Sequence, residues 1–250
     1  MKALVTGASS GIGRDIAREL VGRGWDVILV ARRTDKLMEL KKELGKHAMC
    51  VRCDVSHLEE CKKLHEVMKQ QNIEMLVNCA GFGLCGEFTE TDMSRELEMI
   101  DTNVVAVHVL TKLFLQDFVE KNSGYILNVA SVAGFFAGPL MATYYATKNY
   151  VVSLTGGIYE ELKRRKSNVK ICALCPGPVD TEFNRVAGVS FSSAPIDSRT
   201  AASQALDGLM KGKLYVIPSA KIKALKFVKR LLPERIITQF CYKFQKKKKY

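Results

Sequence analysis

The sequence lacks the long apolar run that a membrane-spanning protein needs. No stretch approaches the ~18 consecutive apolar residues that a transmembrane helix requires. A secretory signal is also not indicated, because Met1 and Lys2 lead directly into a short apolar segment and a glycine-rich turn. We therefore expect a cytoplasmic protein.

The cysteines lack the arrangement of a metal site. The eight cysteines include two pairs spaced three residues apart, Cys50 with Cys53 and Cys172 with Cys175. Both pairs fall in segments that have the pattern of β-strands, where such side chains point to opposite faces and cannot easily bind one ion. We expect reduced, buried thiols and no metal.

Acidic residues are nearly absent from residues 220–250, which we call the tail. The tail contains eleven Lys and Arg residues and one acid, Glu234, so it carries a charge of +10 out of the total of +12. The other 219 residues carry 27 basic and 25 acidic groups. The main part of the chain is therefore nearly neutral, which disfavours nucleic-acid binding by that part.

Short apolar segments alternate with longer helical patterns along residues 1–219. The apolar segments are rich in Val, Ile and Leu, which is typical of parallel strands covered on both faces. We predict one domain, an α/β doubly wound Rossmann fold with about seven parallel strands, followed by a basic helical tail. The predicted strands are 2–6, 26–31, 48–53, 75–79, 125–130, 170–174 and 213–217, and the predicted helices are 11–22, 35–44, 57–71, 91–121, 143–165 and 199–211.

A glycine-rich turn follows the first predicted strand. Gly7, Gly11 and Gly13 permit a tight turn and the close approach of a pyrophosphate, and the next helix presents its first amides to the phosphates. The alternative is an ordinary left-handed turn, but the strand–turn–helix context favours a dinucleotide site. The cofactor-binding residues expected here are Gly7, Ser9, Ser10, Gly11, Ile12 and Gly13.

The second predicted strand lacks the acid that usually selects NAD. Proteins that prefer NAD place Asp or Glu about 20 residues after the glycine turn. This chain has Ala31, Arg32 and Arg33 there, and guanidinium groups suit a 2′-phosphate. Two ordinary surface arginines are the alternative, and Asp35 is expected only to cap the next helix. We predict NADPH in preference to NADH.

Two further strand ends complete the predicted nucleotide site. Asp54 and Val55 end the third strand, where the carboxylate can accept a hydrogen bond from the adenine amino group; capping of the helix near His57 is the alternative. The sequence 78–81 ends the fourth strand, and we expect Asn78, Ala80 and Gly81 to approach the cofactor ribose.

Tyr144 and Lys148 are spaced as neighbours on one helix face. A tyrosine titrates near 10, and a lysine one turn away is expected to lower that pKa so that the hydroxyl can exchange a proton with a carbonyl oxygen. Ser131, at the end of the fifth strand, can polarise the same carbonyl. Tyr145 faces about 100° away from Tyr144 on a helix, so we expect it to pack.

Together these residues resemble the short-chain dehydrogenase/reductase family in its single-domain form, from residue 2 to about residue 217. The resemblance rests on the TGxxxGxG turn at 6–13, the YxxxK pair at 144–148, and the order of Asp54, Asn78, Asn103, Ser131 and Pro176-Gly177. Cys79 stands where the family commonly has Asn, and Ser10 where it commonly has a phosphate-selecting basic residue.

The resemblance implies roles that the residues alone do not give. It implies an oxidoreductase acting on CH–OH and C=O groups, a proton relay through Asn103, a Lys148 contact to the nicotinamide ribose, and a Thr181 contact to the nicotinamide carboxamide. It also implies that Pro176, Gly177 and Val179 bind cofactor, and that the protein is a homodimer or homotetramer with helices 91–121 and 143–165 as interface candidates.

The segments expected beyond the strand ends are apolar. They include Phe82, Leu84, Phe135, Phe136, Pro139, Leu140, Met141 and the stretch from Phe183 to Phe191. A hydrophobic ketone, aldehyde or secondary alcohol, such as a lipid-, acyl- or steroid-like compound, is therefore the expected substrate of this carbonyl reductase, and Arg185 is a candidate contact for a carboxylate. The alternatives are packing of these side chains and a cofactor-binding sensor with a vestigial site.

The tail has the pattern of a basic amphipathic helix. Ile222, Leu225, Val228 and Leu231 share one face, and lysines at 221, 223, 226 and 229 mostly occupy the other. A second apolar pattern covers Ile236 to Phe244, before the lysines at 246–249. Such helices lie on anionic membrane surfaces, which would make the chain a membrane-recruited protein. Packing on the body is the alternative, and no nucleic-acid reading module is present.

Overall fold

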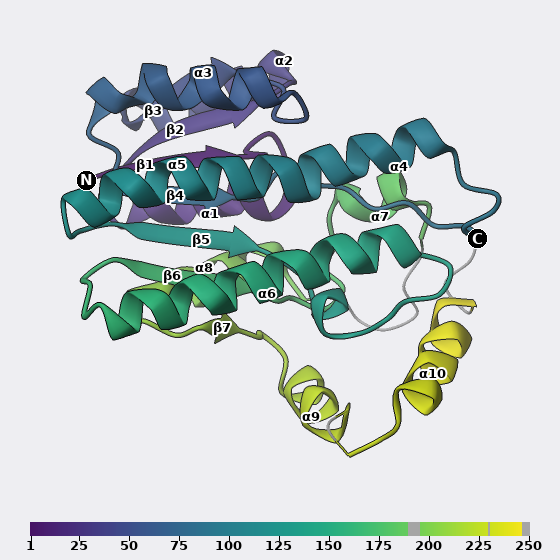
Figure 1. Cartoon of the computed structure of the whole chain (residues 1–250). Helices are drawn as coiled ribbons and strands as arrows, with labels where there is room; N and C mark the ends of the chain where they lie inside the picture. The colour runs from purple at the N-terminus through teal and green to yellow at the C-terminus, as the bar shows by residue number, and fades with distance from the viewer. Residues whose placement is uncertain (190–195, 230, 247–250) are drawn as a thin grey trace.

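Seven parallel strands form one sheet in the computed structural model, which describes residues 1–189, 196–229 and 231–246 (Figure 1). The strand order is β3-β2-β1-β4-β5-β6-β7, so the chain winds outward in one direction from β1 and in the other from β4. The predicted doubly wound fold is confirmed. The strands are β1 (Lys2–Thr6), β2 (Asp26–Ala31), β3 (Ala48–Arg52), β4 (Met75–Asn78), β5 (Tyr125–Val129), β6 (Lys170–Leu174) and β7 (Tyr215–Val216).

Helices cover both faces of the sheet. In Figure 1, α3, α5 and α6 lie in front of the sheet, and α1 and α8 lie behind it. The helices of the body are α1 (Gly11–Gly22), α2 (Thr34–Leu44), α3 (Leu58–Met68), α4 (Met93–Ile100), α5 (Ala106–Glu120), α6 (Ala142–Arg164), α7 (Glu182–Ala187) and α8 (Ser198–Met210). Short 3₁₀ turns occupy Gly45–His47, Lys69–Gln71 and Val132–Phe135.

The strands form where the sequence is apolar throughout because both of their faces are buried. On β1, Ala3 and Val5 pack with α1 and α8, whereas Leu4 packs with α3 and α5 on the opposite face. These three side chains are fully buried. The alternation of side chains along a strand therefore supplies two cores, one on each face of the sheet.

Two predicted segments differ from the structure. The predicted single helix at 91–121 is α4 and α5 joined by a π-helical segment, Asp101–Val105. The long connection that follows β6 contains α7, which the sequence pattern did not predict because it spans only six residues. Phe191, expected to line the substrate site, lies outside the described residues.

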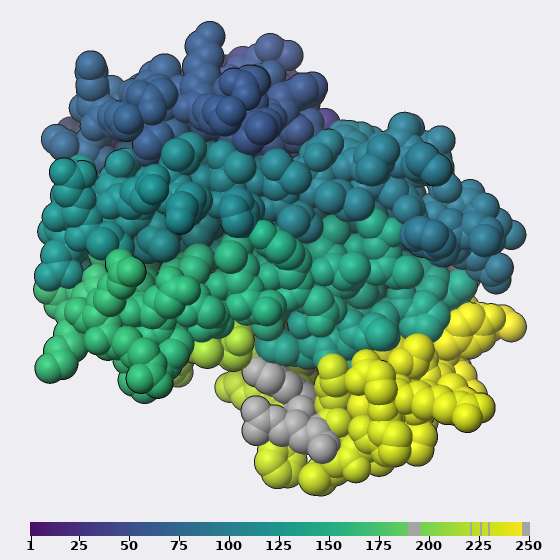
Figure 2. Space-filling view, viewed as in Figure 1, coloured from purple at the N-terminus to yellow at the C-terminus, as the bar shows by residue number. Residues whose placement is uncertain are grey.

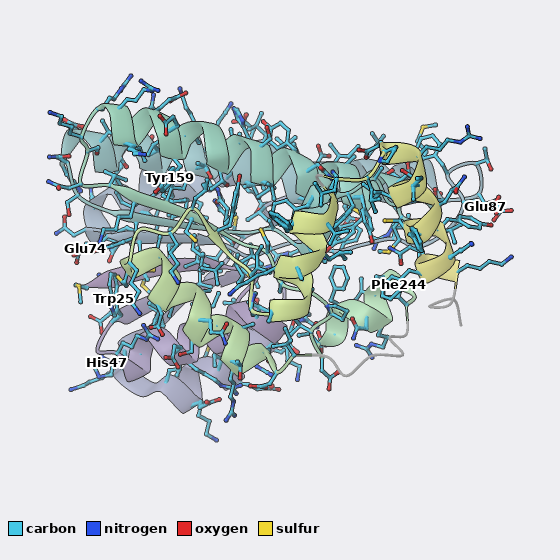
Figure 3. The ribbon with its side chains drawn as sticks, turned by 90° about the horizontal axis from the view of Figure 1, so that it is seen from below. Trp25, His47, Glu74, Glu87, Tyr159 and Phe244 are labelled. Carbon is cyan, nitrogen blue, oxygen red and sulfur yellow. The ribbon has the colours of Figure 1, made fainter. Side chains whose placement is uncertain are left out.

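The tail forms two helices, α9 (Ala220–Lys229) and α10 (Glu234–Lys246), which diverge from the body after β7 (Figure 1). Figure 2 shows the tail as a lobe at the edge of the molecule. In Figure 3, Phe244 of α10 lies at the same end of the molecule as Glu87, and Trp25, His47 and Glu74 lie at the opposite end. Within the described part of the chain, no helix is both long and apolar enough to cross a membrane.

Candidate active site

A cavity of about 410 Å³ lies at the carboxyl ends of the strands. Its wall includes residues that follow β1 and β4, the two neighbouring strands at which the winding direction of the sheet reverses. The structure brings together on its wall nearly all the predicted site residues: Gly7, Ser9, Ser10, Gly11, Ile12, Gly13, Arg32, Arg33, Asp54, Val55, Ala80, Gly81, Ser131, Tyr144, Lys148, Pro176, Gly177, Val179 and Thr181.

The glycine turn joins β1 to α1 in a conformation that side chains would obstruct. Gly7 has φ +67°, and a Cβ added there would lie 2.8 Å from the Ala80 backbone. A Cβ at Gly13 would lie 2.5 Å from the Gly7 carbonyl oxygen. The Thr6 hydroxyl accepts hydrogen bonds from the backbone N–H groups of Cys79 and Ala80, which fixes the turn after β4 against the turn after β1.

The donors at this end of the cavity fit the phosphates of a dinucleotide. The first amides of α1 lie at Gly11–Gly13, on the cavity wall, and a helix N-terminus favours anions. The Arg33 Nη2 donates to the hydroxyl oxygens of Ser9 and Ser10, both at 3.0 Å. A guanidinium, two hydroxyl groups and a helix N-terminus therefore gather at one end of the cavity, as an anionic ligand requires.

Arg32 and Arg33 point to different partners. Arg32 pairs with Glu98 of α4 at 2.9 Å and lies 3.6 Å from the Asp54 carboxylate. Arg33 pairs with Glu182 of α7 at 2.9 Å. The two arginines thus connect the end of β2 with α4 and α7, and each forms an ion pair.

Two residues that are predicted to contact the nucleotide, Asn78 and Asp54, also make side-chain hydrogen bonds within the protein. The Asn78 amide donates to the Thr111 hydroxyl and to Asn128, beneath the sheet edge, and Asn78 does not line the cavity. The Asn78 side chain thus points into the core from a fully buried strand, and the approach of the backbone at 78–81 to the ribose stays a prediction. The Asp54 carboxylate accepts hydrogen bonds from the Ser56 N–H and hydroxyl, so it stabilises a turn and does not cap α3.

Tyr144, Lys148 and Ser131 form the deep wall of the cavity. All three are buried, and Tyr144 and Lys148 lie one turn apart on α6. The Lys148 Nζ lies 6.0 Å from the centre of the Tyr144 ring and donates to the Val129 carbonyl oxygen at 2.9 Å. The Ser131 hydroxyl oxygen accepts a hydrogen bond from the Ala133 N–H and is hydrogen-bonded with Tyr144.

The predicted lowering of the Tyr144 pKa is wrong for this structure. Burial raises the pKa of Tyr144 to about 12, and the hydrogen bond with Ser131 only partly offsets that effect. Burial also lowers the pKa of Lys148 to about 8. The expected lowering of the Tyr144 pKa considered only the attraction between the phenolate and the Lys148 cation. Desolvation of both groups, which that expectation left out, has the larger effect on the two pKa values.

Asn103 lies behind the cavity wall, within the π-helical segment. Its amide Nδ2 donates to the Phe82 carbonyl oxygen at 2.9 Å and to the Thr147 hydroxyl at 3.1 Å, and its Oδ1 accepts from the Phe82 N–H. A Cβ at Gly81 would lie 2.7 Å from this Oδ1 and 3.5 Å from the Lys148 Nζ. Asn103 therefore does not line the cavity, but fixes the Gly81–Phe82 backbone beside Lys148.

The apolar side of the cavity contains fewer of the expected residues. Phe82, Met141 and Phe183 line it, and the Phe183 ring lies 5.4 Å from the Tyr144 ring. Phe135 and Phe136 instead pack in a core between α6, β7 and the tail. Leu84, Pro139, Leu140 and Arg185 are also absent from the wall formed by the described residues.

Among the cavity residues that the sequence analysis did not predict are three with charged or amide side chains, Arg95, Glu182 and Gln245. Arg95 lies 4.7 Å above the Phe82 ring and pairs with Glu98. Charge patterning alone could have indicated Arg95 and Glu182, but no local pattern connects residue 245 with the site, because its hydrogen-bond partner is 100 residues away.

Gln245 brings the tail into the active site. It is only 1% exposed, and its Nε2 donates to the Tyr145 hydroxyl, while its Oε1 has no hydrogen-bond partner among the described residues. The predicted packing role of Tyr145 holds, since its ring fills the space beside Gly138. On α9, Ile222 packs against Gly177 of the cavity wall. The tail therefore contacts the site at two places.

Among the described residues, no three His, Cys, Asp or Glu side chains form a group that could bind a metal ion. The cavity wall itself presents the Tyr144 phenol, the Lys148 amine, the Ser131 hydroxyl and the glycine turn. These groups can hold a nucleotide and deliver a proton to an oxygen atom beside it.

Comparison with known proteins agrees with this geometry. The family model for short chain dehydrogenase matches residues 1–188. A curated relative, an uncharacterized oxidoreductase of Staphylococcus saprophyticus, is 37% identical over 188 residues, which are 73% of this chain and 80% of the relative.

Solved structures match nearly the whole chain. A short-chain dehydrogenase from Sphingobium yanoikuyae in complex with NADPH is 28% identical, with a TM-score of 0.82 over 92% of this chain and 93% of that one. A bulky-bulky ketone specific alcohol dehydrogenase from Comamonas testosteroni is 26% identical, with a TM-score of 0.80 over 92% of each chain. A short-chain dehydrogenase from Burkholderia phymatum in complex with NAD, 24% identical, has the same fold, with a TM-score of 0.84 over 92% of each chain.

Proposed function

Because the chain belongs to the short-chain dehydrogenase family, we propose that it is an NADPH-dependent carbonyl reductase that acts on a hydrophobic ketone or the corresponding secondary alcohol. The family makes the chain an oxidoreductase of C=O and CH–OH groups. One observation carries the proposal: Ser131, Tyr144 and Lys148 share a single cavity with the glycine turn, so a proton donor lies beside the nucleotide-binding end.

The roles of the side chains follow from their positions. A bound nicotinamide would supply the hydride for the carbonyl carbon. Tyr144 gives its hydroxyl proton to the carbonyl oxygen, and Ser131 donates a hydrogen bond to that oxygen. Lys148 holds the nicotinamide ribose and, together with Asn103, belongs to the path that restores the Tyr144 proton. In the reverse direction, Tyr144 accepts the proton of the alcohol.

The preference for NADPH rests on Arg32 and Arg33. Both guanidinium groups lie on the cavity wall directly after β2, where an acid would be expected in a protein that prefers NAD. The Ser9 and Ser10 hydroxyls next to Arg33 add neutral donors for a 2′-phosphate. The NADPH-bound Sphingobium yanoikuyae structure is consistent with this preference.

The hydrophobic substrate is supported by the wall opposite the nucleotide end. Phe82, Met141, Phe183 and Val186 give it an apolar lining, and the Tyr144 ring forms part of the same surface. Among the similar structures is an alcohol dehydrogenase described as specific for bulky-bulky ketones. Gln245 and Arg95 are the polar groups that a substrate would meet on this side.

The experiment is oxidation of NADPH and NADH, followed at the nicotinamide absorbance, against hydrophobic ketones, aldehydes, keto-steroids and 3-oxoacyl esters. We expect turnover with NADPH on at least one compound, and its loss in Tyr144→Phe while NADPH still binds. NADPH binding without any turnover would instead favour a nucleotide sensor with a vestigial site.

We further propose that the tail contacts an anionic membrane surface. Large apolar side chains are exposed on both tail helices and between them: Phe227 of α9 at 64%, Leu231 of the connection at 72% and Phe240 of α10 at 63%. Lys223, Arg235, Lys243 and Lys246 are exposed near them. On α10, the buried residues Ile237 and Gln245 face the body, while Ile236, Phe240 and Phe244 extend the apolar face into solvent.

Co-sedimentation with vesicles tests the tail. We expect the full chain to pellet with vesicles that contain an anionic phospholipid and to stay in solution with purely zwitterionic ones. Phe240→Ser combined with Leu231→Ser should reduce pelleting, whereas Val67→Ser, an equally exposed apolar residue on α3, should not. Equal pelleting of all variants would contradict the proposal.

The remaining assignments are proposals of the same kind. We propose that residues 1–219 form one folding unit with 220–250 as an added tail, and that the protein is a cytoplasmic homodimer or homotetramer. The outer surfaces of α5 and α6 are the interface candidates. Light scattering of the purified chain measures the assembly state, and charge substitutions on α5 or α6 should dissociate it.

A further inference from the structure

Glu182 places a carboxylate inside the predicted phosphate-binding end of the cavity. It lies in the first turn of α7, and its Oε2 is 2.9 Å from the Arg33 Nη1. Both residues line the cavity, Arg33 from the end of β2 and Glu182 from α7. The ion pair therefore lies in the end of the cavity where the phosphates are predicted to bind.

The Glu182 carboxylate is held by the donors that a phosphate would use. Arg33 provides the cation, and the Ser10 hydroxyl is hydrogen-bonded with Glu182 as well as with Arg33. Thr181, which precedes Glu182, lies beside Gly11 of the glycine turn, where an added Cβ would be 3.1 Å from its side chain. An anion from the protein itself thus lies against the glycine turn.

The charge of Glu182 is maintained at neutral pH. Its hydrogen bond to Arg33, and then the charge of that guanidinium, hold the pKa of Glu182 below its usual range, although partial burial opposes them. A second anion on Arg33 would meet this carboxylate at short range, where like charges repel. A 2′-phosphate must therefore displace Glu182 or bind beside it at a cost.

We propose that Glu182 competes with the 2′-phosphate of NADPH for Arg33 and thereby sets how strongly the protein prefers NADPH over NADH. This inference rests on the proposed NADPH site. Glu182 acts through Arg33, so it is a positioning residue. NADH has no 2′-phosphate, and the Arg33–Glu182 pair can stay intact when NADH binds.

The test is the affinity of the full chain for two adenine nucleotides, measured by titration calorimetry. The probes are 2′,5′-ADP, which carries the 2′-phosphate, and 5′-AMP, which lacks it. We expect Glu182→Gln to bind 2′,5′-ADP about three- to fivefold more tightly, the range of one exposed ion pair, and to leave 5′-AMP unchanged. Asp35→Asn removes a nearby charge that does not contact Arg33, and should change neither affinity.

A double-mutant cycle identifies the path of the effect. In the Arg33→Ala background, Glu182→Gln should no longer alter the affinity for 2′,5′-ADP, because the shared partner is gone. If the substitution still tightens binding there, or tightens both nucleotides equally, the competition for Arg33 is refuted. The Glu182 side chain is half-buried, with 40% of its surface exposed, so loss of folding is not expected in these variants.

The outcomes separate this inference from the proposed cofactor preference. If the wild-type chain binds both nucleotides equally, the NADPH preference is wrong. In that case the competition is supported if Glu182→Gln creates a preference for 2′,5′-ADP, and refuted if it does not. If the wild type prefers 2′,5′-ADP and Glu182→Gln leaves that preference unchanged, only the competition is refuted.

Discussion

The inner wall of the active site and the tail that borders it are built in opposite ways. On the inner wall Lys148 is 6% exposed, and behind that wall Asn103 is fully buried; each makes a hydrogen bond to the backbone. In the tail, Ile237 and Gln245 are buried, while most of the large apolar side chains face solvent. The difference teaches that the groups proposed to react are held in place by buried hydrogen bonds. The tail, in contrast, buries few side chains and exposes most of its large apolar ones.

The largest expected effect concerns the two adjacent tyrosines of the inner wall. We expect Tyr144→Phe to reduce turnover by about 10²- to 10⁴-fold, because the proton donor is removed. Tyr145→Phe removes only the hydrogen bond with Gln245 and should cost no more than about fivefold. Steady-state NADPH oxidation measures both. Similar losses in the two variants would contradict the assignment of Tyr144.

Loss of the buried hydrogen bonds of Asn103 should lower the free energy of unfolding more than loss of an ion pair near the surface. Asn103→Ala removes three hydrogen bonds and leaves the Phe82 backbone groups unpaired, so we expect the free energy of unfolding to fall by about 2–4 kcal/mol. As a control, Glu98→Gln weakens the ion pairs of Glu98 with Arg32 and Arg95 nearer the surface, and should cost less than about 1 kcal/mol. Chemical denaturation gives both values, and equal costs would refute the comparison.

The pH dependence should follow Lys148. Burial lowers its pKa to about 8, so Lys148 is charged below that pH and neutral above it. We expect kcat/KM for NADPH, which reports the free enzyme, to fall above about pH 8, by about tenfold per pH unit. Binding of 2′,5′-ADP, which has no nicotinamide half, should stay level over the same range. A level kcat/KM would contradict the role of Lys148.

The smallest effect is expected in the tail. Phe240→Ser should change the free energy of unfolding by no more than about 0.5 kcal/mol, because the side chain is 63% exposed. Ile237→Ala, on the buried face of the same helix, should cost more, since it exposes a cavity in the contact with the body. Thermal denaturation compares them. An equal loss of stability in both would show that Phe240 is covered in solution.

Much of this architecture could be predicted from the sequence because its causes are local. Apolar segments bounded by turns gave β1, β2 and β6 with their observed ends, and the glycine turn and the Tyr144–Lys148 spacing identified the two ends of the cavity. What the sequence could not give depends on three-dimensional environment. The burial that reverses the expected Tyr144 pKa and the inward direction of Asn78 are properties of the assembled sheet.

The contacts made by distant segments were also beyond prediction. Arg33 and Glu182 are far apart along the chain, and no local pattern in the sequence indicates that the two side chains pair. The π-helical segment at Asp101–Val105 has no composition signal, yet it carries Asn103 to the Gly81–Phe82 backbone. Such features are decided by which elements meet, not by the propensity of either one.

The position of Gln245 limits how far the substrate of a relative can be assigned to this chain. The family match ends at residue 188, so the nucleotide-binding turn and the inner wall lie within the shared part of the chain, whereas Gln245 lies beyond it. One residue of the cavity wall therefore comes from outside the matched range. Under the proposed function, replacing the tail with that of a relative is expected to change which carbonyl compound is accepted and to leave the cofactor preference unchanged.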